Sequence, residues 1–161
     1  METENNHEES LITAIDTAVD EYERSQGLPR YVDNLDNQDA KHFLSLSRTQ
    51  MEKMNLEECG EAALILGGFS FHLQRSYNRE IARYNWAESL LKKTISGKEQ
   101  QYSGSWDSQF SQAVNENSYA LKLLKLKNNS KLRADHLTFL ATSVKNMGDL
   151  FVNLQRAKAM K

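Results

Sequence analysis

The sequence predicts an all-α protein: a long helical hairpin with short N-terminal helices packed on it, assembled into an oligomer. Pro29 is the single proline among 161 residues, so nothing after it forces a helix to break. With seven glycines, the chain has few of the turn residues that a sheet protein needs. Apolar residues instead recur at steps of three and four, which is the period of an amphipathic helix.

Two helices and a loop are expected in the N-terminal third. The first runs from about Ser10 to Gly27. Its apolar residues stand mostly three or four positions apart, at Leu11, Ile12, Ile15, Val19 and Tyr22. Asp and Asn are frequent over residues 30–39, which is typical of a loop. A short helix is expected from about Ala40 to Met54.

The strongest element is a helix from about Leu56 to Ile95, roughly 60 Å long at 1.5 Å per residue. A helix of this length cannot bury its apolar stripe against itself, so it needs a partner helix or a second chain. Gly67-Gly68 is expected to permit close helix packing or a kink. Residues 96–106 form the expected connector. The apolar stripe is Leu66, Phe69, Leu73, Tyr77, Ile81, Tyr84, Leu91 and Ile95.

A second long helical region is expected from about Asp107, with residues 128–130 as a candidate interruption. Its last part has apolar residues in a strict 3-4-3-4-3 spacing, which is typical of a coiled-coil seam. We therefore expect this seam to be the oligomer interface. Its residues are Leu137, Leu140, Val144, Met147, Phe151 and Leu154.

Charge divides the chain into two parts. Residues 1–61 carry 15 acidic and 5 basic residues, and residues 62–161 carry 7 acidic and 15 basic residues. This asymmetry favours a polyanionic partner for the C-terminal part, although charged helix faces are often only solvated. We expect an acidic N-terminal extension over 1–36 and a helical DNA-binding and oligomerisation domain over 37–161. The extension could be a tail, a self-shielding arm or a protein contact.

The motifs of most enzymes are missing from the sequence. The four histidines do not have the spacing of metal ligands. The sequence also has no glycine-rich loop of the kind that binds nucleotide phosphates. Cys59 lies among glutamates, which disfavour a reactive thiolate. We therefore expect no catalytic residues, no metal and no cofactor. No apolar run is long enough to cross a membrane, and no secretory signal is visible. A cytoplasmic location, with no membrane partner, is expected.

Basic and aromatic residues follow the long helix in one row, at Arg75, Arg79, Arg83, Trp86 and Lys93. Arginine donates forked hydrogen bonds to phosphates, and an aromatic ring can stack on an unpaired base. Lys98, Tyr102 and Trp106 extend this pattern into the connector. Lys122 and Lys125 begin a second basic cluster. The alternatives are a solvated arginine flank and a Trp86 that belongs to the core.

The connector reads Ser96-Gly97-Lys98-Glu99-Gln100-Gln101-Tyr102-Ser103-Gly104. Together with the preceding basic helix, it resembles the UvsY-type recombination mediators of T-even-like phages. Lys98 stands at the second basic position of the motif of that family, and Tyr102-Ser103-Gly104 matches its end. Ser96 replaces the first basic residue, and Gln101 replaces an aromatic residue. The similarity covers roughly the last hundred residues.

The resemblance implies a recombination mediator that binds single-stranded DNA without sequence preference. It implies a hexamer or heptamer, and a role in loading a RecA-like recombinase onto strands coated by single-strand-binding protein. If the chain is phage-encoded, its location would be the host cytoplasm. By position, Lys98 would contact DNA with Tyr102 beside it. The alternative is a non-enzymatic helical structural or assembly protein of a phage.

Overall fold

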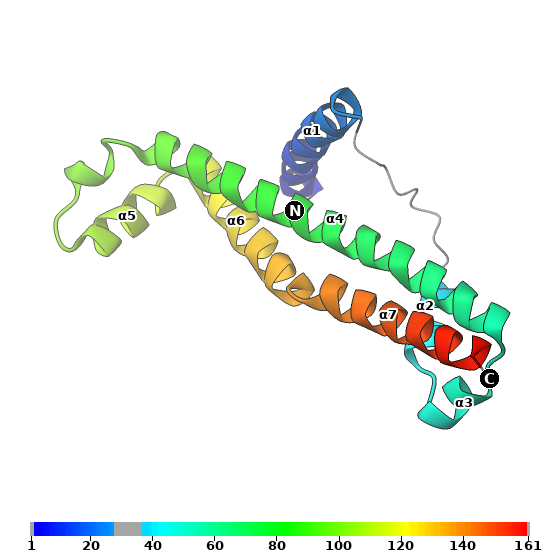
Figure 1. Cartoon of the computed structure of the whole chain (residues 1–161). Coiled ribbons are helices and arrows are strands. Elements are labelled where there is room, and N and C mark those ends of the chain that lie inside the picture. Colours follow the sequence, from blue (N-terminus) through cyan, green and yellow to red (C-terminus); the bar gives the residue numbers. More distant parts are fainter. Residues whose placement is uncertain (1, 28–36, 161) are drawn as a thin grey trace. The chain divides into compact units, whose positions relative to one another are not determined.

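The computed structural model describes residues 2–27 and 37–160, and every element in these two ranges is helical. By sequence order these elements are α1 (Glu2–Ser25), α2 (Asn37–Leu44), α3 (Arg48–Lys53), α4 (Leu56–Ile95), the 3₁₀ turn η1 (Glu99–Gln101), α5 (Trp106–Asn115), α6 (Ser118–Leu137) and α7 (Leu140–Ala159) (Figure 1). The all-α prediction is therefore confirmed. No helix in the described part of the chain is long and apolar enough to cross a membrane.

The chain divides into two compact units. Unit 1 comprises Met1–Leu28 and Asn78–Asp135, and unit 2 comprises Pro29–Tyr77 and His136–Lys161. The 40-residue helix α4 supplies its first part to unit 2 and its second part to unit 1. The expected domain boundary after residue 36 lies outside the described residues.

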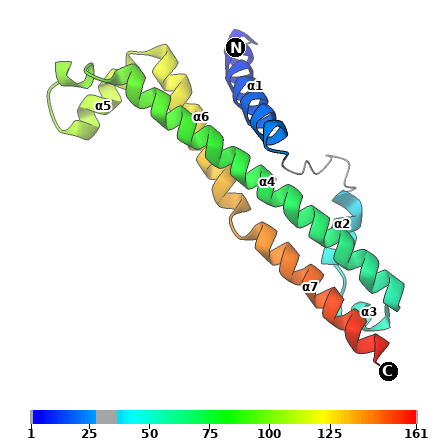
Figure 2. The same cartoon turned by 45° about the horizontal axis from the view of Figure 1, so that its top comes forward.

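Unit 2 is built on antiparallel packing of α7 against the first part of α4 (Figure 2). Near the end of α7, the Gln155 side-chain amide donates to the Leu56 carbonyl at 3.0 Å. Further back on α7, a Cβ added at Gly148 would lie 3.5 Å from the Ala63 carbonyl oxygen and 3.5 Å from Leu66 Cβ. Gly148 therefore permits the close approach of the two helices. The sequence predicted that Gly67-Gly68 permits close helix packing. Nothing lies within 4 Å of a Cβ added at Gly67, so Gly148 takes part of that role.

The core of unit 2 joins α2, α4 and α7. Phe151 is fully buried, and its ring meets the Phe43 ring edge-on at a centroid distance of 6.2 Å. The buried members of this core are Ala40, Phe43, Ala62, Leu66, Leu73, Ala141, Val144 and Phe151. The C-terminal apolar seam therefore packs within the chain.

Unit 1 pairs the second part of α4 with α6, also antiparallel. Lys127 of α6 contacts Glu88 of α4, and Arg133, further along α6, contacts the earlier Glu80. One apolar cluster joins the end of α4 to α5 and the start of α6, through Leu91, Ile95, Val114 and Leu123. A second cluster holds α1, through Ile15 against Ala87 and Leu126.

Several helix boundaries differ from the sequence prediction. α1 begins at Glu2, before the expected start near Ser10, and α2 begins at Asn37, within the expected loop. The expected helix 40–54 is two helices, because Ser47 caps α3 through a reciprocal capping box with Gln50. The candidate interruption at 128–130 is wrong: α6 continues through it, and Ser130 is fully buried. The breaks lie instead at Asn117, whose Oδ1 accepts from the Ala120 amide, and at Phe139, which has a φ of 64°.

Phe151→Ala tests the core of unit 2. Removal of a fully buried phenylalanine leaves a cavity, and the free energy of unfolding should fall by about 3–5 kcal/mol. Leu150→Ala, at a neighbouring side chain that is 49% exposed, should cost about 0.5 kcal/mol or less. Urea unfolding followed by far-ultraviolet circular dichroism measures both values. Equal losses would show that Phe151 is not the centre of this core.

Candidate nucleic-acid interface

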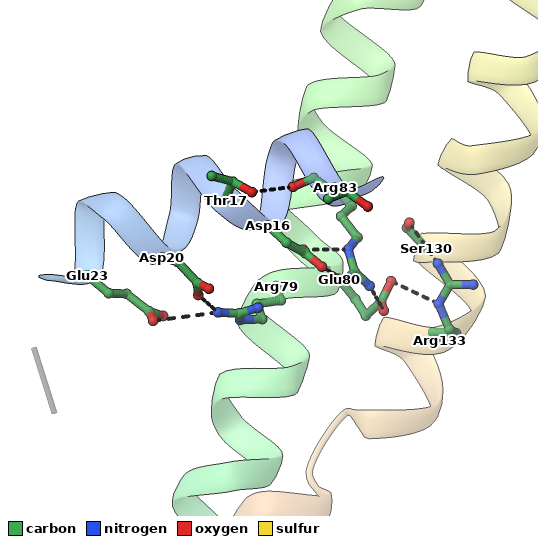
Figure 3. Close-up of polar contacts among 10 residues, drawn as sticks. Asp16, Thr17, Asp20, Glu23, Arg79, Glu80, Arg83, Ser130 and Arg133 are labelled. Atoms are coloured by element: carbon green, nitrogen blue, oxygen red, sulfur yellow. Dashed lines mark hydrogen bonds and ion pairs between the residues drawn. The ribbon is translucent and has the colours of Figure 1, made fainter. Parts of the chain in front are cut away.

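The two central arginines of the predicted row, Arg79 and Arg83, both face carboxylates of α1 (Figure 3). Arg83 donates twice to Asp16, from Nε to Oδ1 at 3.1 Å and from Nη2 to Oδ2 at 2.5 Å. Arg79 donates to Asp20, and its Nη2 lies 3.7 Å from Glu23 Oε2. Only 19% of the Arg79 side chain and 16% of the Arg83 side chain are exposed. In this structure α1 therefore covers both guanidinium groups.

The carboxylates reach the arginines because of their spacing on α1. Asp16, Asp20 and Glu23 stand four and three residues apart, so they share one helix face. Ile15 is buried on the adjoining face, where Ile12 and Val19 pack against the same cluster. Among the described side chains, the apolar contact of α1 with the rest of unit 1 is thus made by Ile12, Ile15 and Val19, and it is flanked by ion pairs.

Glu80 links the covered arginines to α6. It is 7% exposed, and its carboxylate lies between Arg83 Nη1, at 2.5 Å, and Arg133 Nε, at 3.0 Å. Burial alone would lower the pKa of the Arg83 guanidinium, but the hydrogen bond to Asp16 and the charges of Glu80 and Asp16 raise it overall. Arg83 therefore stays charged within this network. In the network drawn in Figure 3, three arginines contact four carboxylates, and three of these carboxylates belong to α1. Glu80 is the fourth.

The remaining members of the row have different surroundings. Trp86 is partly buried and packs against both apolar clusters of unit 1. This matches the alternative in which Trp86 belongs to the core. Arg75 is half-buried in unit 2. Lys93 is exposed near the end of α4.

Lysines remain exposed at the end of unit 1 where α4 stops. Lys93 and Lys98 are exposed, and 70% of the Lys92 side chain is accessible to solvent. The apolar cluster that joins Leu91 to Leu123 brings the start of α6 to this same end, with Lys122 half-buried and Lys125 exposed. We call this lysine-rich end, formed by residues 92–125, the tip.

An exposed aromatic pair lies at the tip. Trp106 opens α5 and is 64% exposed, and its ring stacks on Phe110 at a centroid distance of 5.1 Å and an interplanar angle of 28°. Ser105 caps this helix by accepting from the Ser108 amide. Phe110 thus supports the Trp106 ring from one side. The sequence pattern had already grouped Trp106 with Lys98 and Tyr102 of the connector, although the family resemblance pointed to Tyr102 as the ring at the DNA.

Tyr102, which the family resemblance places at the DNA, is half-buried. Its hydroxyl donates to Glu116 Oε2 at 2.6 Å, and this hydrogen bond raises the pKa of the tyrosine. It also packs against the cluster that contains Leu91 and Val114. Tyr102 therefore holds the connector onto α5, and Trp106 is the more accessible of these two rings.

The predicted oligomer seam is largely used inside the chain. Val144 and Phe151 are buried at 3% and 0% exposure. Leu137, Met147 and Leu154 are half-buried, and Leu140 is 41% exposed. The apolar spacing therefore predicted a face that is packed in the structure. The helices that pack against it are α2 and α4 of the same chain.

The potential metal ligands and the single cysteine are further candidates for a site in the described part of the chain. Over residues 2–27 and 37–160, no three His, Cys, Asp or Glu side chains are placed to hold a metal ion. Cys59 is buried, and this burial raises the pKa of its thiol. No protein-family model, curated protein or solved structure matches this chain.

Glu88→Gln tests the α4–α6 contact by its pH dependence. The hydrogen bond from Lys127, at 3.0 Å, lowers the pKa of Glu88. A carboxyl whose pKa is lowered on folding stabilises the fold above its ordinary pKa, and this stabilisation is lost as the pH falls through the lowered value. The variant should therefore be less stable than the wild type at pH 7, by about 1 kcal/mol or less.

At a pH below the lowered pKa, Glu88 is protonated and resembles glutamine, so the two proteins should unfold at the same urea concentration. Urea midpoints at both pH values provide the measurement. Glu57→Gln, at an exposed position in the first turn of α4, is the control. A difference from wild type that persists at low pH would contradict the assigned ion pair.

Proposed function

We propose that this protein binds single-stranded DNA without sequence preference and acts as a recombination mediator. The observation that carries the proposal is the Trp106 ring, supported by Phe110 and exposed among the lysines of the tip. Lysines attract the phosphate backbone, and an accessible ring can stack on any base. Neither contact depends on which base is present, which suits binding without sequence preference.

The mediator role follows from the resemblance of the connector to UvsY-type proteins. Lys98, which stands at a basic position of that motif, is exposed at the tip. One tip offers few contacts, so several copies in a hexamer or heptamer would hold one strand by avidity. A strand held in this way would be accessible to a RecA-like recombinase while single-strand-binding protein departs.

A second candidate is a helical structural or assembly protein. The observation that favours it is the pairing of Arg79 and Arg83 within the chain, which leaves neither for phosphates in this conformation. A single measurement separates the two functions. Fluorescence anisotropy of a labelled oligo-dT strand, titrated from 50 mM salt upwards, should give a log–log slope of about −0.7 per contacted phosphate. Absence of binding at 50 mM salt would favour the structural protein.

Lys98→Glu should weaken binding to oligo-dT at 50 mM salt, because it replaces a phosphate contact with a repulsive charge. The salt slope should become shallower by about 0.7 for the lost contact. Lys53→Glu makes the same change of charge at an exposed position of α3 in unit 2, and should have little effect. Equal weakening by both variants would mean that only net charge matters.

Trp106→Ala should lower affinity by about 1–3 kcal/mol, the range for loss of one stacked base. The salt slope should stay unchanged, because no charge is removed. Phe71→Ala, at a 65% exposed ring in unit 2, is the matched control. If Trp106→Ala binds like the wild type, the aromatic pair is not part of the DNA site.

The loading role needs its own assay. A RecA-type recombinase, single-strand-binding protein and oligo-dT are combined with and without this chain, and recombinase filament formation is followed by ATP hydrolysis. The proposal expects a shorter lag with the chain than without it. An unchanged lag alongside normal DNA binding would limit the function to strand binding.

A further inference from the structure

We propose that α1 is a displaceable arm that occupies a second phosphate-binding surface, formed by Arg79 and Arg83 of α4. This inference rests on the proposed function and adds its regulation. Single-stranded DNA would compete with α1 for these guanidinium groups. The site at the tip would then extend along α4 only when α1 has left.

Charge complementarity supports this competition. Asp16, Asp20 and Glu23 present a row of carboxylates on one face of α1, and they meet the guanidinium groups as phosphate oxygens would (Figure 3). The bidentate contact of Arg83 with Asp16 is the geometry in which arginine also binds phosphate. α1 thus fills the surface with a chemical substitute for the nucleic acid backbone.

The wider charge balance points the same way. Residues 1–28 contain eight acidic residues and one basic residue, whereas residues 78–135 contain ten basic and six acidic residues. The rest of unit 1 is therefore cationic, and α1 reverses its net charge. Removal of α1 from the arginines would leave Arg79, Arg83 and Arg133 with Glu80 as the single carboxylate of the network drawn in Figure 3.

The apolar contact of α1 is small enough for release. Ile15 is its one buried apolar side chain among those described. A hollow remains between α1 and α4, so the two helices are not closely packed along this face. It is lined by Ala14, Ile15, Ala18, Val19, Tyr22, Ala82 and Trp86. Much of the attachment is therefore electrostatic, and a polyanion competes directly with electrostatic contacts.

Trp86 reports on the position of the arm, because it lines the same hollow and packs against the cluster that holds Ile15. The chain has two tryptophans. Trp106→Phe therefore leaves Trp86 as the single tryptophan emitter and keeps an aromatic ring at the tip. Displacement of α1 would expose Trp86 to water or to a base, and either would change its emission.

The test uses the full chain with Asp16→Asn and Asp20→Asn together, which removes two carboxylates and keeps the apolar anchor of α1. Glu21→Gln with Glu57→Gln is the control, since it removes the same charge at two exposed positions. Affinity for oligo-dT at 50 mM salt should rise about fivefold or more in the double aspartate variant, with a salt slope steeper by about 0.7 for each phosphate gained. The control should bind like the wild type.

Ile15→Ala releases the arm by another route, with every carboxylate kept, and should also raise the affinity. In the Trp106→Phe background, saturating oligo-dT should change the emission of Trp86. Circular dichroism of each variant checks that its helices are retained, so that an altered affinity can be separated from unfolding.

The outcomes separate this inference from the proposed function. The first outcome is that the wild type binds, Lys98→Glu weakens this binding, and the double aspartate variant and Ile15→Ala bind like the wild type. The proposal that α1 is a displaceable arm would then be wrong, and the proposal of DNA binding at the tip would be retained. Equal gains in the double variant and its control would also refute the arm, because only net charge would matter. If no variant binds oligo-dT at 50 mM salt, both proposals fail.

Discussion

The structure depends on one constraint: α4 is an unbroken helix of 40 residues, and its apolar side must be covered along its whole length. Different helices meet this need in the two units, α7 with α2 in unit 2 and α6 with α5 in unit 1. Since burial of apolar surface is the main favourable term in folding, these helices are fixed in place by the stripe of α4. The polar face of α4 is then left for other contacts, and α1 takes part of it.

The elements that could be predicted from the sequence are those with a strong apolar period. The limits of α4 agree with the prediction, because its apolar stripe recurs from Leu66 to Ile95 and no proline interrupts the helix. The sequence analysis predicted one helix over 40–54, because no glycine or proline separates α2 from α3. The signal for a new helix was the capping box formed by Ser47 and Gln50. At residues 128–130, packing of the α6 face that carries Leu126 and Ala134 on either side of Ser130 overrides the weak helix propensity of Asn and Ser.

The candidate site was predictable only in part. Helical spacing correctly placed Arg79 and Arg83 on one face, but spacing within one helix cannot show which other segment covers that face. Asp16, Asp20 and Glu23 repeat at the same spacing, and this was the available signal for the ion pairs. The seam at the C-terminus shows the same limit. Its apolar period defined a packing face, while its partner became evident only when α2 and α4 were seen to bury Val144 and Phe151.

Phe139 has a consequence for how the chain opens. A bulky side chain at a φ of 64° costs roughly 1–2 kcal/mol relative to a helical conformation. Phe139 is 80% exposed, so packing of its ring offsets little of this free energy. The junction of α6 and α7 is thus under local backbone strain beside two well-packed helices. Amide hydrogen exchange should be fastest there within the C-terminal pair, and a protease would cut at this bend before it reached either helix.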